Sequence, residues 1–192
     1  MKIKNSKKSL VEIIFFMTLF SLSISVSLSE ERTLTIKSGV YYFHPSEEST
    51  RDIYGGKAVI GGEVSVKVWK SIDLWLAGSY YNERGHLPFT KEATRLILTS
   101  VGGGSKIILK SGRISPYVGL GPVIYSYREK NPIGLAKGTK IGIIGQAGCY
   151  LKVTGGLLFD ICIDYSYCVV KPQRIKANIG GIKAGIGLGF EF

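Results

Sequence analysis

The sequence predicts an all-β protein, an eight-stranded antiparallel up-and-down transmembrane β-barrel. Three observations lead to this class. The chain contains 25 glycines in 192 residues, and glycine at that level disfavours helix interiors. Stretches such as "LFDICIDYSYCVV" alternate apolar and polar residues, which is the period of a strand with one apolar face. Short and longer connections alternate between these stretches, as in barrels that have tight turns at one end and loops at the other.

The first 29 residues have the pattern of a secretory signal peptide. Four lysines precede an apolar run, and small polar residues follow it. This pattern predicts cleavage after Ser29, with Ser27 as the alternative site. An uncleaved helical anchor over Leu10–Leu28 is the competing interpretation, which Glu12 and the serines in that run disfavour.

The rest of the chain, residues 30–192, is expected to form one barrel domain. A β structure in a bilayer must close on itself to satisfy its backbone, and about 9–11 residues per strand suffice to cross. The register of "SVGGGSKIIL" is left open, because its three glycines predict a bulge or a bend. The eight predicted strands cover residues 32–44, 55–69, 71–84, 92–109, 115–129, 139–153, 156–170 and 175–192.

The apolar faces of these strands are expected to meet lipid, and the polar faces to fill the lumen. Eight strands leave an interior that side chains can fill, and buried charges must pair to avoid a cost of several kcal/mol each. Five basic and five acidic residues fall on the polar faces, so the sequence predicts a nearly neutral plug of ion pairs. These residues are Lys37, Glu63, Lys67, Asp73, Arg95, Lys152, Asp160, Asp164, Lys183 and Glu191.

Aromatic residues gather near the predicted strand ends, where they are expected to form girdles at the two membrane interfaces. They are Tyr42, Phe43, Trp69, Tyr80, Tyr81, Tyr125, Tyr127, Tyr165, Tyr167, Phe190 and Phe192.

Several hairpins resemble those of a known family. Phe190 and Phe192, at the end of "ANIGGIKAGIGLGFEF", resemble the assembly signal of bacterial outer-membrane proteins. That segment, "GGEVSVKVWKSIDLWLAGSYY" and "SPYVGLGPVIYSYRE" are similar to hairpins of the small outer-membrane β-barrel family, which includes OmpX and the OmpA membrane domain. The resemblance covers residues 32–192. It implies a bacterial outer-membrane location, a monomer, and contact with the assembly machinery and with outer-membrane lipids, including lipopolysaccharide.

The sequence favours a non-enzymatic protein with a structural or surface-interaction role. Only His44 and His86 could serve a lipid-modifying enzyme as bases, and local spacing to Ser46 or nearby acids does not establish a triad. Asp160 and Asp164 lie about 13 Å apart along a strand, too far for a shared proton. No cofactor or metal site is predicted. A small passive pore, or a conduit for apolar solutes, is the main alternative, and a secreted soluble barrel with the opposite faces inward is another.

The net charge and the cysteines do not indicate a particular function. The net charge is +11, or +8 once residues 1–29 are removed. The basic residues are scattered, so nucleic-acid binding is not predicted. Those at the loop end are expected either to meet anionic headgroups or to form a solvated rim. Three cysteines, Cys149, Cys162 and Cys168, give no complete disulfide set and are interpreted as small apolar fillers.

Overall fold

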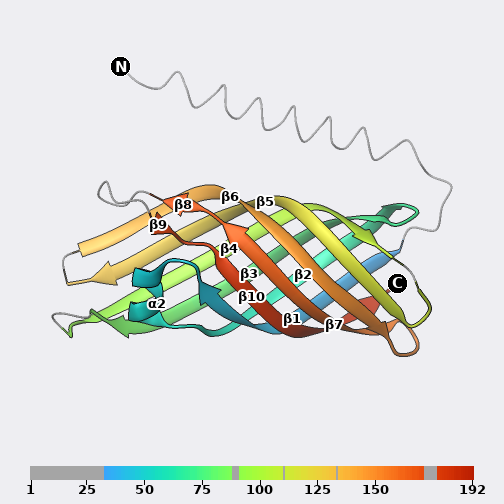
Figure 1. The fold of residues 1–192 in the computed structure, drawn as a ribbon, viewed down its shortest axis with the longest axis horizontal. Coiled ribbons are helices and arrows are strands. Elements are labelled where there is room, and N and C mark those ends of the chain that lie inside the picture. Colours follow the sequence, from blue (N-terminus) through green and yellow to red (C-terminus); the bar gives the residue numbers. More distant parts are fainter. Residues whose placement is uncertain (1–32, 88–90, 110, 133, 171–176) are drawn as a thin grey trace, which may run out of the picture. The chain divides into compact units, whose positions relative to one another are not determined.

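The computed structural model describes residues 33–87, 91–109, 111–132, 134–170 and 177–192, and the predicted signal peptide lies outside them. Within these ranges no helix has the length and apolarity that crossing a bilayer demands. Eight strands form one closed antiparallel barrel (Figure 1). They are β1 (Leu34–Pro45), β2 (Lys57–Trp69), β3 (Ile72–His86), β4 (Ala93–Ile108), β5 (Ile114–Asn131), β6 (Gly134–Lys152), β7 (Leu157–Tyr167) and β10 (Gly181–Glu191).

The first and last strands close the barrel. β1 pairs antiparallel with β10 from Thr35 opposite Glu191 to Pro45 opposite Gly181. The strands β1 to β7 pair in chain order, and β10 pairs on its other side with β7. Closure leaves no open edge in the barrel sheet, which is the condition for a β structure within lipid. The predicted fold class is therefore confirmed.

The two faces of the strands are arranged as the alternation predicts. On β7, Phe159 and Ile161 are exposed while Asp160 and Cys162 are buried. The same alternation on the other strands gives the barrel an apolar outer wall and a largely polar central lumen. The soluble-barrel alternative required the opposite arrangement.

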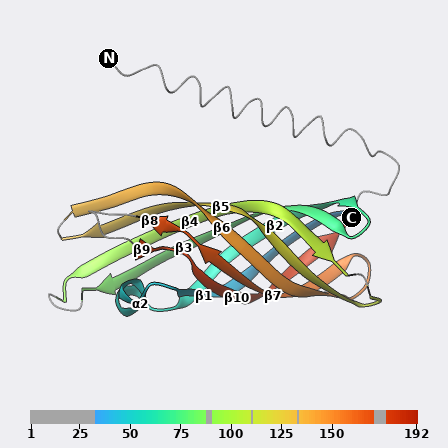
Figure 2. The ribbon, with the colours of Figure 1, turned by 45° about the horizontal axis from the view of Figure 1, so that its top comes forward.

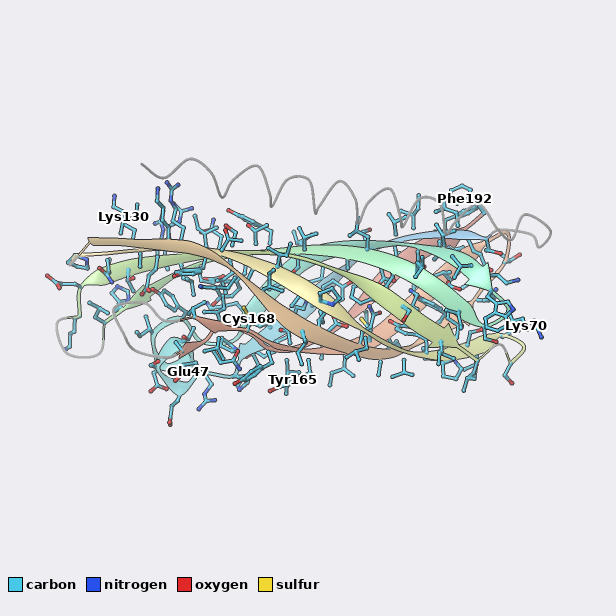
Figure 3. The ribbon with its side chains drawn as sticks, turned by 90° about the horizontal axis from the view of Figure 1, so that it is seen from above. Glu47, Lys70, Lys130, Tyr165, Cys168 and Phe192 are labelled. Atoms are coloured by element: carbon cyan, nitrogen blue, oxygen red, sulfur yellow. The ribbon has the colours of Figure 1, made fainter. Side chains whose placement is uncertain are left out.

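The two ends of the barrel differ. Tight connections join the strands at the end that carries Lys70 and Phe192, here called the turn end (Figure 3). The other end, here called the loop end, carries helix α2 (Glu48–Tyr54) and a small sheet of β8 (Val169–Val170) and β9 (Ala177–Asn178) (Figure 2).

The loop end holds more regular structure than the sequence predicts. A helix replaces the predicted loop 45–54, and β6 begins at Gly134 rather than at residue 139. The β5–β6 hairpin extends to the pair Asn131 and Gly134, where the Asn131 side-chain oxygen also accepts a hydrogen bond from the Gly134 N–H. The last barrel strand begins at Gly181, not at residue 175, because Ala177–Asn178 pairs with β8 instead.

The three glycines of β4 lie where its pairing with β5 is interrupted, and they do not form a bulge. Pairing with β5 stops after Gly102 opposite Val123 and resumes at Ser105 opposite Leu120. Equal numbers of residues lie between these pairs on both strands, so no residue is inserted. A Cβ on Gly121 would lie 2.0 Å from the Gly103 carbonyl oxygen, so this close approach of the two backbones requires glycine.

The predicted aromatic girdles are correct only in part. Phe43, Tyr81 and Tyr125 are 3% exposed and point into the lumen, because they occupy inward positions of their strands. Tyr127 is half-buried and packs against the same inner side chains. The exposed aromatics are Tyr42, Trp69, Tyr80, Tyr165, Tyr167, Phe190 and Phe192.

Candidate functional site

The centre of the lumen is filled by two lysines, two carboxylates and two tyrosines, here called the central cluster. Six strands contribute one residue each: Lys37, Glu63, Lys106, Tyr117, Tyr150 and Asp160. All six are less than a tenth exposed. Their formal charges sum to zero, which is the condition for burying four ionised groups together.

Each lysine of the central cluster has a carboxylate partner. Lys37 Nζ lies 2.6 Å from Asp160 Oδ2 and 3.4 Å from Glu63 Oε1. Lys106 Nζ lies 2.5 Å from the same Glu63 oxygen. Glu63 therefore bridges the two lysines, and the four charges form one connected group across the lumen.

The tyrosines complete the hydrogen bonding of the central cluster. The Tyr117 hydroxyl donates to Asp160 at 2.9 Å, and Lys106 donates to the Tyr150 hydroxyl at 2.6 Å. The two rings stack with centroids 4.6 Å apart, and both ammonium groups lie 5.1–5.3 Å from the ring centroids. At this distance cation–π attraction adds to the ion pairs.

A glycine leaves space for the Tyr117 ring. Gly148 lies opposite Tyr117 in the β5–β6 register. A Cβ on Gly148 would lie 2.5 Å from the Tyr117 hydroxyl oxygen, so a larger residue would displace the ring.

Other predicted lumen charges form pairs above and below the central cluster. Toward the loop end, Lys183 Nζ lies 3.5 Å from Asp164 Oδ2. At the turn end, Lys152 pairs with Glu191. Lys67 lies opposite the buried Asp73 in the β2–β3 register, and both line a cavity of about 20 Å³ together with the Lys152–Glu191 pair.

The prediction for Arg95 is wrong. Arg95 lies on the outer face of β4, where its Nε donates to Asn82 Oδ1 at 2.9 Å. Leu96 and Leu98, predicted to face lipid, point inward instead. The predicted faces of this strand were exchanged because three glycines separate its two halves and carry no side chains to set the alternation.

Lys106 takes the place that sequence reasoning gave to Arg95. It is 1% exposed and lies in the stretch whose register the sequence left open. The alternation of Ile107 and Leu109, both exposed, was the available signal that Lys106 faces inward. Tyr117 and Tyr150 lie on the predicted inner faces. The alternation of a strand gives the face of a tyrosine but not whether its hydroxyl will bond to a buried charge.

The loop end is closed by a second, largely apolar layer. The Tyr54 side chain, at the end of α2, packs inside the rim against Phe43, Val59 and Tyr81. Its hydroxyl bonds to Thr94 Oγ1 and donates to Glu129 Oε1, both at 2.8 Å. Burial raises the pKa of Tyr54 and the nearby Glu129 carboxylate adds to the rise, so the phenol remains a donor at neutral pH.

Described residues on either side of 171–176 cover the other side of the mouth. Val170, Ile179 and Cys168 pack against Trp75 of the lumen wall. The Asn178 side-chain oxygen accepts hydrogen bonds from the Cys168 and Gly180 N–H groups, which ties β9 to the end of β7.

Among the described residues, two hydrogen bonds join the two covers. The Asn178 N–H donates to Glu47 Oε2 at 3.0 Å, and the Ser46 N–H donates to the Gly180 carbonyl oxygen at 3.1 Å. The segment before α2 and the residues around β9 therefore meet over the mouth. Figure 3 shows Glu47 and Cys168 toward the same end of the barrel.

The remaining interior space is small. Cavities of about 20 and 10 Å³ lie between the central cluster and the loop end. Each holds about one water molecule at most. Among the described residues, no group of three His, Cys, Asp or Glu side chains is placed to bind a metal ion. His44 and His86 are exposed at the loop end, and the three cysteines are free thiols.

Comparison with known proteins gives fold relatives only. No family model and no curated protein matches the sequence. Among solved structures, Neisserial surface protein A is similar with a TM-score of 0.57 and 15% identity over 85% of this chain and 100% of that one. The N-terminal β-barrel domain of Pseudomonas aeruginosa OprF matches with a TM-score of 0.55 and 16% identity over 85% and 98%.

A third match is Ail, the attachment invasion locus protein of Yersinia pestis, in complex with the heparin analogue sucrose octasulfate. It has a TM-score of 0.55 and 15% identity, and the match covers 85% of this chain and 100% of Ail. These proteins are small bacterial outer-membrane β-barrels. The present chain has their fold. The predicted signal peptide and the assembly role of Phe190 and Phe192 stay predictions.

Proposed function

We propose that this protein is a non-enzymatic outer-membrane barrel with a structural or surface-interaction role, and that its lumen does not conduct. The observation that carries the proposal is the central cluster. Its six side chains join six of the eight barrel strands and fill the lumen in the half nearer the turn end. A protein whose interior is occupied by interlocked charges can act through its outer wall and its loop end, not through a passage.

Two features of the structure argue against the pore alternative. Water would have to displace a group of buried ion pairs that holds itself together across the lumen. An apolar solute would meet cavities of only about 10 and 20 Å³ between the loop end and that group.

Planar-bilayer recording tests the sealed lumen. The refolded protein should give no steady single-channel steps, while a water-filled porin inserted in the same bilayer as a positive control gives them. Reproducible channels of constant amplitude, absent from a boiled sample of the same preparation, would contradict the proposal.

The absence of an enzymatic activity needs a separate test. We expect the mass spectrum of lipid A to be the same in cells with and without the protein. A new acylation or deacylation product that disappears in a His44→Ala or His86→Ala variant would overturn this part of the proposal.

A further inference from the structure

The outer wall of β4, β5 and β6 carries two features that the sealed lumen does not explain. One is a group of basic side chains near the loop end, and the other is an apolar groove nearer the middle of the wall. We propose that together they form a binding site for a membrane lipid whose headgroup carries separated phosphates, and that one acyl chain of this lipid lies in the groove. The proposal rests on the membrane location given above, but not on whether the lumen conducts.

The first feature is here called the basic band. It consists of outward-facing residues of four adjacent strands near the loop end: Arg84, Arg95, Arg128, Lys130 and Lys137. Figure 3 shows Lys130 close to that end of the molecule. Arg95, Arg128 and Lys130 also line a hollow of about 550 Å³.

Neighbouring members of the basic band face one another across the sheet. Arg84 lies opposite Arg95, Arg95 opposite Lys130, and Arg128 opposite Lys137. Like charges in directly opposite positions destabilise a sheet. An anion bound between them would offset this repulsion.

No protein carboxylate shares this outer face in the described part of the four strand ends. Glu83 points inward, where it lies 4.0 Å from Lys57. Glu129 also points inward and accepts the hydrogen bond from Tyr54. The charge that would complement the basic band must therefore come from outside these strands.

The basic band covers only one half of the barrel. It is confined to β3, β4, β5 and β6 because these strands extend past the others at the loop end: Arg84 and Lys137 lie beyond Tyr80 and Ile143, where pairing with β2 and β7 ends. The basic side chains therefore lie together on the four strands that extend farthest at the loop end.

The second feature is an apolar groove of about 640 Å³ on the same wall. Its floor is formed by two small residues of β6, Gly145 and Ala147, and its sides by larger residues of β5 and β7. Register places Leu120, Gly145 and Tyr165 in one row across these strands. Val118, Ala147 and Ile163 form the next row.

The distance between the two features suits one lipid. Lys137 and Gly145 are eight residues apart on β6, which is about 26 Å along the strand. Strand tilt reduces this to about 20 Å along the membrane normal. One leaflet contains about 15 Å of hydrocarbon, so a lipid whose phosphate reaches the basic band can extend a chain into the groove.

The width of the basic band selects the headgroup. Four adjacent strands span about 14 Å at 4.8 Å per strand. A headgroup with two separated phosphates matches that width better than a single phosphate does. The chemical class is therefore a diphosphorylated glycolipid of the surrounding leaflet.

The experiment measures retention of purified lipid A by the folded protein in detergent micelles, by native mass spectrometry. Diphosphoryl lipid A should be retained more strongly than the monophosphoryl form. Because each basic residue near an anionic surface contributes about fivefold in affinity, Arg128→Gln/Lys130→Gln should weaken retention about 25-fold. The matched control, Lys70→Gln/Arg113→Gln, removes the same charge from exposed positions at the turn end and should have no effect.

The groove has its own matched pair of variants. A Cβ on Gly145 would meet no atom closer than 3.9 Å, so Gly145→Leu fills the groove without a backbone clash. Gly78 is also an exposed glycine of the outer wall, with its nearest atom at 3.7 Å. Gly145→Leu should weaken retention at least fivefold and Gly78→Leu should not. Ala147→Leu replaces the first variant if that one does not fold.

Three results would overturn the proposal. The first is an equal loss of lipid A retention in Arg128→Gln/Lys130→Gln and Lys70→Gln/Arg113→Gln. That result would indicate only general attraction between a basic protein and an anionic lipid. The second is unchanged retention when the groove is filled. The third is a dimer that Gly145→Leu abolishes, because the groove would then bind a second copy. Channel recordings report separately on the sealed lumen, so failure of either idea leaves the other testable.

Discussion

At the scale of single residues, the central cluster shows how charges can be buried at low cost. Lys106 is 1% exposed, and its ammonium group has both a carboxylate and a phenol as partners. Glu63 contacts two lysines, so its removal would affect both. Removal of any one charged member would leave another buried charge unpaired, which is strongly destabilising.

We expect Lys106→Met to lower the free energy of unfolding by about 3–5 kcal/mol, because it leaves a buried carboxylate in excess. Glu63→Gln/Lys106→Met restores neutrality and should lose less than the sum of the two single variants. Urea titration of the protein in detergent micelles measures these differences.

The control for this prediction is Lys57→Met. Its half-exposed ion pair with Glu83 should be worth at most about 1 kcal/mol. Strict additivity of the two cluster variants, or an equal effect of Lys57→Met, would contradict the account of the cluster as one connected group.

Strand patterns predict individual positions well where alternation is unbroken. Lys37, Glu63 and Asp160 fall on the predicted inner faces, and the structure places all three in one cluster. Arg95 was assigned to the wrong face and Lys106 was not assigned, because glycines between them interrupt the alternation. The partner of each charge could not be predicted from the sequence. Lys37 and Asp160, for example, lie on β1 and β7, which come close only when β10 between them closes the barrel.

At the scale of elements, the sequence predicts the strands of the barrel but not the structures that cover its mouth. The period of two identifies all eight strands within a few residues. Helix α2 is only seven residues long, and β8 and β9 have two residues each. Such short elements have no usable period, and tertiary contacts such as those of Tyr54 determine them.

Tyr54→Phe should loosen α2 without unfolding the barrel. Removing a hydroxyl with two partners costs about 1–3 kcal/mol, so amide hydrogen exchange in residues 48–54 should become faster by about 5- to 150-fold. Tyr80→Phe is the matched control, because Tyr80 is an exposed tyrosine of the outer wall.

Tyr54 should also make the stability of α2 depend on pH in the alkaline range. The pKa of Tyr54 is raised in the folded protein. The stabilisation of α2 by its phenol is therefore complete below the pKa of tyrosine in the unfolded chain, about 10. The contribution is lost as pH rises from there toward the folded value. Wild-type exchange in α2 should therefore accelerate above about pH 10 more than exchange in Tyr54→Phe does. Equal acceleration in both proteins would show that Tyr54 does not hold the helix.

At the scale of the whole molecule, the fold and the proposed role depend on closure. A sheet of eight strands without free edges can lie in lipid, and its apolar outer wall requires such surroundings. The described lumen is filled at its centre and covered at the loop end, so the surfaces left for recognition are the outer wall and the loops.

A closed barrel should resist detergent until it is heated. We expect the protein to fractionate with outer membranes, and an unboiled sample to migrate differently from a boiled one in gels containing dodecyl sulfate. The reason is that hydrogen bonds around the whole barrel must break together. Recovery as a soluble protein without detergent, with one mobility before and after boiling, would contradict both the fold class and the location.

The central cluster has a consequence for assembly. Its members come from β1, β2, β4, β5, β6 and β7, and Lys37 and Asp160 become neighbours only when β10 has joined the two ends of the sheet. A half-formed sheet would present unpaired ammonium and carboxylate groups to any lipid it met. Insertion into the bilayer is therefore unfavourable until the barrel has closed. The charges that seal the finished protein thus also favour strand pairing before insertion.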